Sequence, residues 1–222
     1  MSGLSALIPA AGVGTRLGHG PKAWLELDGQ PALVWLVLKL MDLTDDVLAA
    51  VSAQEMAQAQ QVVKRHGLRV RLVTGGATRQ ASVLRLVESA QSPWVLIQDV
   101  ARPFATRVLQ KSVFLAAQEY GAAAACVATE VPVARLENGW ITGHLPAPEV
   151  AIFQAPQAFE RLPLLDVLSQ AQVAGIERQT TAQLWLDAGK PIYPVQGEKT
   201  NIKLTTPEDW VMAQSLMEYL HR

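Results

Sequence analysis

Cysteine is nearly absent from this 222-residue chain, since Cys126, in the apolar run 122–127, is the only example. A single cysteine cannot form an intramolecular disulfide, which is typical of a protein from a reducing compartment. The sequence has no uninterrupted apolar stretch of the roughly 18 residues that a membrane-spanning helix needs, and it does not open with the pattern of a secretion signal. We therefore expect a soluble, cytoplasmic protein that does not bind membranes.

An excess of charge of one sign is lacking too, because the formal net charge at pH 7 is −1. A nearly neutral chain has no overall field that would attract nucleic acid or an anionic membrane, so any affinity for phosphate must be local. Hydrophobic residues make up 50% of the chain and charged residues 18%, which is enough apolar material for a sizeable core. The length favours a single domain over residues 1–222.

A predicted strand over residues 5–9 leads into a loop of small residues that is followed by two cations, Arg16 and Lys22. Such a loop lets a phosphate or a flat base approach the backbone, whose N–H groups can bind an anion. Arg16 is suited to a forked contact with two oxygens, and Lys22 supplies a compact charge. The nucleotide contacts predicted in this loop are Pro9, Ala10, Ala11, Gly12 and Gly14.

Two other glycine motifs do not fit this loop. Gly12, Gly14 and Gly18 have the spacing G-x-G-x-x-x-G, whereas the dinucleotide-binding motif is G-x-G-x-x-G. Lys22 is followed by Ala23, whereas a P-loop needs Ser or Thr at that position to hold magnesium. The structural alternative is a tight connection between a strand and a helix, with a solvated lysine and arginine.

Predicted strands and helices alternate along most of the chain. This alternation favours an α/β fold with a mostly parallel central sheet flanked by helices. The expected strands cover 5–9, 46–51, 69–73, 94–98, 122–129, 191–195 at a sheet edge, and 201–204. The expected helices cover 31–41, 54–66, 79–89, 108–120, 163–173, 180–187 and 207–220.

The apolar strand predicted over 94–98 is followed by Asp99, and Arg102 lies three residues further on. Open α/β sheets bind ligands at the carboxyl ends of their strands, and Mg²⁺ favours one or two carboxylates together with phosphate oxygens. We therefore predict that Asp99 is a magnesium ligand and that Arg102 holds a phosphate or Asp99 itself. An aspartate that caps the next helix is the alternative.

Five motifs span nearly the whole chain. They are Pro9–Arg16 with Pro21 and Lys22, Gly75–Val83, Asp99–Pro103, Ala155–Phe159 and Asn201–Asp209. In their order and approximate spacing they resemble the motifs of the 2-C-methyl-D-erythritol 4-phosphate cytidylyltransferases. The resemblance implies a single-domain, Rossmann-like nucleotidyltransferase fold and a Mg²⁺-dependent transfer of CMP from CTP to a polyol phosphate, in isoprenoid biosynthesis.

The resemblance also implies a role for particular residues. Arg16 and Lys22 would be catalytic, because attack of one phosphate on another requires positive charge at the reacting phosphorus. Gly75, Gly76 and Ser82 would hold the cytosine and the ribose. Arg102 and Lys203 would bind the acceptor phosphate.

Residues 131–154 are expected to form a β-arm with turns at 137–139 and 146–148. In the family that the chain resembles, this region reaches over a partner subunit. Its apolar side chains would be unfavourable in water, which independently favours a homodimer. They are Trp140, Ile141, Leu145, Val150, Ile152 and Phe153. A hairpin folded onto its own domain is the alternative.

The acceptor side departs from the family pattern near Ala134, Ala147, Ala155 and Gln179, and Ala77 stands where an acidic residue is usual. Three functions therefore stay open. The chain is a cytidylyltransferase for methylerythritol phosphate that uses Lys203, Arg102 and Arg135, a cytidylyltransferase for another polyol or sugar phosphate, or a nucleotide-binding relative with little activity. A dinucleotide-dependent oxidoreductase is a more distant alternative.

Overall fold

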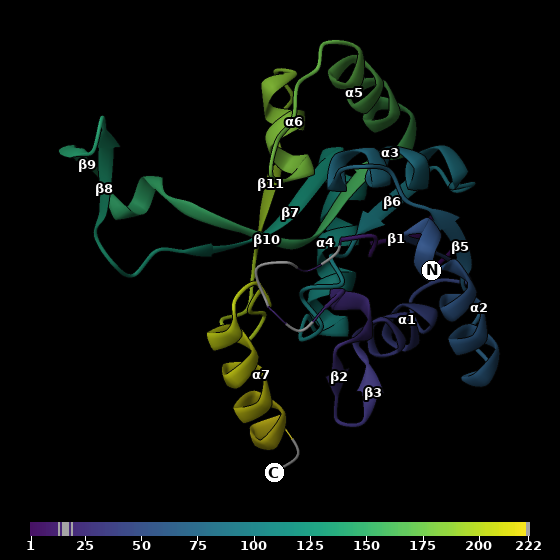
Figure 1. Ribbon diagram of the computed structural model, residues 1–222. Coiled ribbons are helices and arrows are strands. Elements are labelled where there is room, and N and C mark those ends of the chain that lie inside the picture. The colour runs from purple at the N-terminus through teal and green to yellow at the C-terminus, as the bar shows by residue number, and fades with distance from the viewer. Residues whose placement is uncertain (13, 15–17, 19, 221–222) are drawn as a thin grey trace.

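The computed structural model describes residues 1–12, 14, 18 and 20–220. Within these residues one sheet contains β1 (Leu4–Pro9), β4 (Asp46–Val51), β5 (Arg71–Thr74), β6 (Trp94–Ile97), β7 (Ala122–Ala128), β10 (Ala151–Glu160) and β11 (Tyr193–Gln196). The strand order is β11-β7-β10-β6-β1-β4-β5 (Figure 1). Of these neighbouring strands, β10 pairs antiparallel with β6 and β7, and the other pairs are parallel. The predicted α/β class with a mostly parallel sheet is confirmed.

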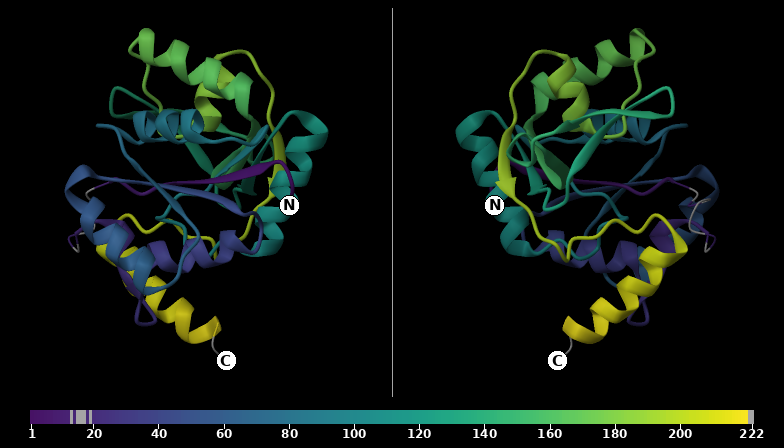
Figure 2. Two further views of the ribbon diagram at one scale, coloured as in Figure 1. Left: turned by 90° about the vertical axis from the view of Figure 1, so that its right-hand side faces the viewer. Right: turned by 90° about the vertical axis from the view of Figure 1, so that its left-hand side faces the viewer.

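Helices cover both faces of the sheet (Figure 2). One face packs against α1 (Ala32–Met41), α2 (Met56–Arg65), α4 (Arg107–Tyr120) and α7 (Pro207–Leu220). The other packs against α3 (Arg79–Ser89), α5 (Arg161–Val173) and α6 (Thr181–Asp187). Short 3-10 turns occur at η1 (Lys22–Trp24), η2 (Ala53–Glu55) and η3 (Ala147–Glu149). No helix in the described part of the chain is long and apolar enough to cross a membrane.

Burial on both faces explains why the central strands have continuous apolar sequences. In β1, the side chains of Ala6 and Ile8 belong to the core beneath α1, whereas Leu7 belongs to the core beneath α3. Successive side chains of a strand point to opposite faces, so a strand between two helical layers needs apolar residues at every position. The same layering places the carboxyl ends of β1 and β6 side by side.

The strand predicted over 201–204 is wrong, because these residues, all described by the structure, form no ladder with a neighbouring strand. The carbonyl of Asn201 accepts a hydrogen bond from the Arg102 guanidinium, and the carbonyl of Leu204 accepts one from the Lys22 ammonium. Side chains thus bind groups that would otherwise pair with a strand.

Two strand features are missing from the sequence predictions. Strand β10 contains Pro156, and its pairing with β7 shifts register between Phe153 and Gln157, where an irregularity accommodates a proline. The small hairpin of β2 (Glu26–Leu27) and β3 (Gln30–Pro31) turns at Asp28 and Gly29, which both have positive φ.

A second hairpin, made of β8 (Val133–Glu137) and β9 (Trp140–Leu145), projects away from the body of the molecule (Figure 1). Its turn contains Asn138 and Gly139, both with positive φ, as expected of a two-residue β-turn. The protruding arm is therefore present. Leu136, Trp140 and Ile141 on it are 68%, 77% and 72% exposed.

Candidate active site

A cavity of about 380 Å³ opens where β1 and β6 end and α3 begins. The loop after β1 contributes Pro9, Ala11, Gly12 and Gly14, and the approach to α3 contributes Gly76 and Ser82. Among the described residues, the charged ones that line the cavity are Lys22, Arg79, Asp99 and Lys203. The fold therefore brings most of the predicted site residues to one place, although they come from distant parts of the sequence.

Gly75 allows its loop to approach the loop after β1, and Gly76 allows the same loop to pack against the first turn of α3. A Cβ atom on Gly75 would lie 2.4 Å from the Cβ of Ala11, and one on Gly76 would lie 2.5 Å from the Cβ of Ala81. Both distances are shorter than van der Waals contact allows, so a larger residue at either position would displace the backbone. Gly75 is not among the described residues that line the cavity, but it packs against Ala11 and Ser82, which do line it. Ala10 is not among these lining residues either, since it is buried and its N–H donates to the Ala50 carbonyl.

Ser82 fixes the start of α3. Its hydroxyl oxygen accepts a hydrogen bond from the Gly76 N–H at 3.0 Å, and the hydroxyl donates to the Thr78 carbonyl at 2.9 Å. Thr78 is the N-cap of α3 and accepts from the Ala81 N–H. The first turn of a helix attracts anions because its N–H groups point outward, so this part of the wall suits a nucleotide.

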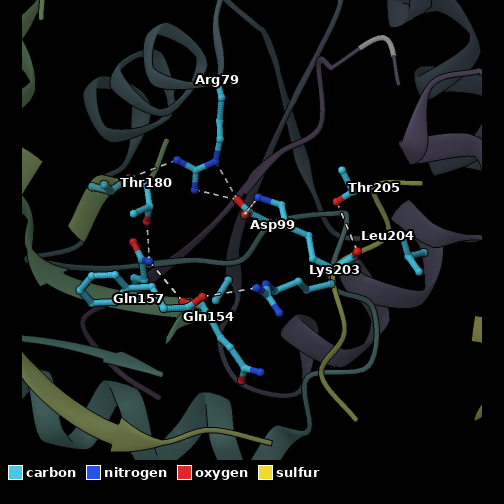
Figure 3. Close-up of polar contacts among 12 residues, drawn as sticks. Arg79, Asp99, Gln154, Gln157, Thr180, Lys203, Leu204 and Thr205 are labelled. Carbon is cyan, nitrogen blue, oxygen red and sulfur yellow. Dashed lines mark hydrogen bonds and ion pairs between the residues drawn. The ribbon is translucent and has the colours of Figure 1, made fainter. Parts of the chain in front are cut away.

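Asp99 lies between two cations at the base of the cavity (Figure 3). Its Oδ1 accepts hydrogen bonds from Arg79 Nε at 2.9 Å and Arg79 Nη2 at 2.7 Å, and its Oδ2 lies 3.7 Å from Lys203 Nζ. Burial raises the pKa of the Asp99 carboxyl, but Arg79, Lys203 and Arg102 together outweigh burial and hold that pKa below its ordinary value. The carboxylate is therefore ionised at neutral pH.

The alternative role for Asp99, as a helix cap, does not describe this structure. Helix α4 is capped by Thr106, whose hydroxyl oxygen accepts from the Leu109 N–H. The Asp99 side chain faces the cavity instead.

Arg79 lines the cavity and lies within the Gly75–Val83 motif, but no role is predicted for it from the sequence. It is the first residue of α3, where a cation is electrostatically unfavourable, and this position is the signal that could have identified it. Arg79 Nη1 also lies 3.5 Å from the hydroxyl of Thr181, at the start of α6. Arg79 thus connects the first turn of α3 to Asp99 and to the start of α6.

Lys22 and Lys203 reach the cavity from opposite ends of the chain. Lys22 is the first residue of η1, and its Nζ donates to the carbonyl of Leu204 at 2.5 Å. Leu204 directly follows Lys203. The predicted catalytic residue Arg16 lies outside the described residues.

Arg102 binds backbone carbonyls in this structure. Its guanidinium donates to the backbone carbonyls of Asn201 and Phe153, and Arg102 is absent from the described residues that line the cavity. Burial lowers the pKa of Arg102, and Asp99 partly counteracts this effect. In this arrangement Arg102 supports the segment that carries Lys203.

A second cavity of about 470 Å³ shares Thr78, Arg79 and Lys203 with the first. Its other lining residues are Gln80, Glu177, Arg178, Gln179 and Thr205. Of the positions that depart from the family pattern, Gln179 faces this second cavity and Ala155 is buried in β10. Ala134 lies in β8, next to the exposed Arg135, and Ala147 is the first residue of η3.

Comparison with known proteins agrees with this geometry. The family model for 2-C-methyl-D-erythritol 4-phosphate cytidylyltransferase matches residues 4–219. The protein of that name from Thermus thermophilus is 38% identical over 213 residues, which cover 96% of both chains. The one from Deinococcus radiodurans is 36% identical over 212 residues, which cover 96% of this chain and 88% of the relative.

Solved structures give the same result. The crystal structure of the Thermus thermophilus enzyme superposes with a TM-score of 0.81 at 36% identity, covering 96% of this chain and 98% of that one. A 4-diphosphocytidyl-2C-methyl-D-erythritol synthase from Anaerococcus prevotii, at 23% identity, shares the fold with a TM-score of 0.87 over 99% and 96% of the two chains. This chain therefore belongs to the 2-C-methyl-D-erythritol 4-phosphate cytidylyltransferase family.

Proposed function

We propose that this protein transfers CMP from CTP to 2-C-methyl-D-erythritol 4-phosphate and releases pyrophosphate. Membership of the family supports the reaction and both substrates. The structural observation that carries the proposal is the convergence of Lys22, Arg79 and Lys203 on one cavity that also contains Asp99 and a wall of small residues. Such a cavity suits a triphosphate next to a second phosphate.

In this reaction an oxygen of the acceptor phosphate attacks the α-phosphorus of CTP. A new P–O bond forms as the bond from the α-phosphorus to the bridging oxygen breaks, and pyrophosphate leaves with that electron pair. A phosphate monoester has a second pKa of about 6, so it needs no strong base at neutral pH. The protein must instead align two anions and compensate their charge.

Lys22 and Arg16 are the residues that we assign to charge compensation at the α-phosphoryl oxygens. Lys22 lines the same cavity as Gly76 and Ser82. Gly76 and Ser82 would contact the cytidine, while Ala11, Gly12 and Gly14 leave room for its approach. Lys203, which lines both cavities, would bind the acceptor phosphate.

The residues of the cavity fit a magnesium ion that is held mainly by substrate. Asp99 is the single carboxylate among the described residues that line the cavity, and no group of three or more His, Cys, Asp or Glu side chains suited to a metal occurs within the described chain. Mg²⁺ commonly binds one or two carboxylates and several phosphate oxygens, which agrees with this donor set. When bound, Mg²⁺ would neutralise phosphate charge and orient the triphosphate.

The second cavity is the proposed site of the acceptor. Its position beside Arg79 and Lys203 places it next to the nucleotide cavity, as a direct transfer requires. Another polyol phosphate is a second candidate acceptor, because Arg178 and Gln179 face this cavity where the family pattern is not preserved.

We also propose that the protein is a cytoplasmic homodimer. The exposed apolar side chains of the arm would be covered by a partner subunit, since contiguous apolar surface commonly marks an interface. Loss of dimerisation by charged substitutions in the arm would support this arrangement.

Pyrophosphate release tests the proposed reaction. The protein would be incubated with CTP and Mg²⁺ and a panel of phosphorylated polyols that includes methylerythritol phosphate. We expect rapid release with methylerythritol phosphate. Preferred release with another polyol phosphate would identify the second candidate, and no release with any acceptor would contradict cytidylyl transfer.

A further inference from the structure

The segment that carries Lys203 is a loop held mainly by side chains. Its ends are bound through backbone hydrogen bonds, from Gly197 N–H to the Cys126 carbonyl at 2.7 Å and from Leu204 N–H to the Ala101 carbonyl at 2.8 Å. Residues 198–203 between these points do not pair with a strand. The position of Lys203 therefore depends on the side chains that hold the loop.

Gln154 of β10 binds both the backbone and a side chain of this loop. Its Nε2 donates to the Glu198 carbonyl at 2.9 Å, and its Oε1 accepts from the Glu198 N–H at 3.2 Å. Its Oε1 also accepts from Asn201 Nδ2 at 3.2 Å. The side-chain amide thus binds the loop backbone as a neighbouring strand would, through one donor and one acceptor.

Burial makes these contacts specific. Gln154 is 7% exposed and Asn201 is fully buried, and Asn201 Nδ2 also donates to the Ala155 carbonyl at 2.7 Å. Buried polar groups that lose a partner are left unsatisfied, which costs more than the loss of a solvated hydrogen bond. The loop has few alternative positions that keep these groups paired.

We propose that Gln154 is a positioning residue that sets where the Lys203 ammonium lies relative to Asp99 and the acceptor phosphate. The role of Lys203 in this inference rests on the proposed function. The claim that Gln154 holds the loop in place does not. Lys203 Nζ lies 3.7 Å from Asp99 Oδ2, and the Gln154 side chain points away from Asp99 (Figure 3). Gln154 therefore acts through the loop and not on the substrate.

Gly197 gives an independent way to disturb the same contact. A Cβ atom at Gly197 would lie 2.5 Å from Gln154 Oε1 and 3.0 Å from the Cys126 carbonyl oxygen. Gly197 is not among the residues with positive φ, so alanine is compatible with its backbone conformation. Gly197→Ala should displace the Gln154 amide, and to a smaller extent press on the Cys126 carbonyl, without removing any polar group.

The kinetic experiment compares Gln154→Met and Gly197→Ala with Thr44→Val in the full-length protein. Methionine keeps the length of the side chain and removes both hydrogen-bonding groups. Thr44 is a buried control between α1 and β4, and its hydroxyl donates at 2.6 Å to the carbonyl of Leu4, which begins β1 at the end opposite to the cavity. Misplacement of a positioning group by about 1 Å can reduce a rate on the order of a hundredfold.

We expect both test variants to raise the KM for the acceptor and lower kcat, together reducing kcat/KM for the acceptor at least about tenfold. The KM for CTP should change less than the KM for the acceptor, because the loop after β1 and the first turn of α3, which would hold the nucleotide, lie outside the segment that Gln154 binds. Thr44→Val should lower the melting temperature without raising the KM for the acceptor relative to the KM for CTP. Equal changes in the two KM values, or no change, would overturn the inference.

Hydrogen–deuterium exchange of residues 198–204 tests the structural part separately from catalysis. Exchange in this segment should accelerate at least about tenfold in Gln154→Met and in Gly197→Ala, and should be unchanged in Thr44→Val. Unchanged exchange in both test variants would overturn the inference even in an active enzyme. A wild-type protein without transferase activity would contradict the proposed function, and the exchange result would still decide whether Gln154 holds the loop.

Discussion

Arg79 donates two hydrogen bonds to a single oxygen of Asp99, at 2.9 and 2.7 Å. The guanidinium thereby joins the first turn of α3 to the end of β6 and keeps a partly buried carboxylate charged. Because Arg79 binds Oδ1, the other oxygen, Oδ2, faces Lys203. Several measurable consequences depend on this pair.

Replacing Arg79 should change the pH dependence of turnover. The pKa of Asp99 in the folded protein is below its ordinary value. The ion pair therefore stabilises the fold fully at any pH above the ordinary pKa of an aspartate. This stabilisation is lost as the pH falls through the lower pKa of the folded state. In Arg79→Met, the positive charge that contributes most to lowering the pKa of Asp99 is removed, so burial would raise that pKa. The acidic limb of the kcat profile should then move to higher pH.

A surface ion pair provides the control for this experiment. Arg71 binds Asp46 at 2.7 Å, and both side chains are partly exposed. Arg71→Met should leave the pH profile unchanged. An Arg79→Met profile that coincides with the wild-type profile would contradict the assignment of Asp99 to the active site.

Lys22→Ala should reduce kcat by about a hundredfold to a thousandfold, the usual effect of removing a group that stabilises charge in the transition state. Steady-state kinetics at saturating CTP and acceptor would measure the loss. Lys64→Ala removes an exposed lysine of α2 and should have no effect. Full turnover by Lys22→Ala would exclude a catalytic role for this residue.

Gly75→Ala should weaken CTP binding at least about tenfold, because the new methyl group would collide with Ala11 and force the two loops of the cavity wall apart. Isothermal titration calorimetry with CTP would measure the change. Gly143→Ala on the arm is a matched control, since its Cβ would meet only Arg135 Cβ, at 3.9 Å. Equal CTP affinity in both variants would show that close approach of the loops is not required.

Charged substitutions in the arm should dissociate the proposed homodimer. Trp140→Lys places a charge in the apolar surface of β9, and sedimentation equilibrium would report the change in mass. Val108→Lys, at a residue of α4 that is 74% exposed, tests whether any added surface charge has this effect. A wild-type protein that is monomeric at all concentrations would contradict the proposal.

The sequence predicts most of the parallel sheet because its strands are buried on both faces and read as continuous apolar runs, as in β1 and β6. It fails at β10, where Pro156 interrupts the pattern at a register shift that depends on β7. It also fails at 201–204, whose alternating sequence is typical of a strand although side chains bind its carbonyls.

The candidate site is predicted in part. The glycine loops, Lys22, Asp99 and Lys203 meet at one cavity, as their motifs indicate. The supporting role of Arg102 could not be predicted, because it depends on a long-range contact with Asn201. The same is true of the hydrogen bonds between Gln154 and Glu198.

A crystal structure with CTP and Mg²⁺ tests the central claim most directly. We predict that the triphosphate occupies the cavity, with Lys22 Nζ bound to an α-phosphate oxygen, the metal next to Asp99, and the cytidine against Gly76 and Ser82. Binding of CTP outside this cavity, or a Lys22 side chain directed away from the α-phosphate, would contradict the account.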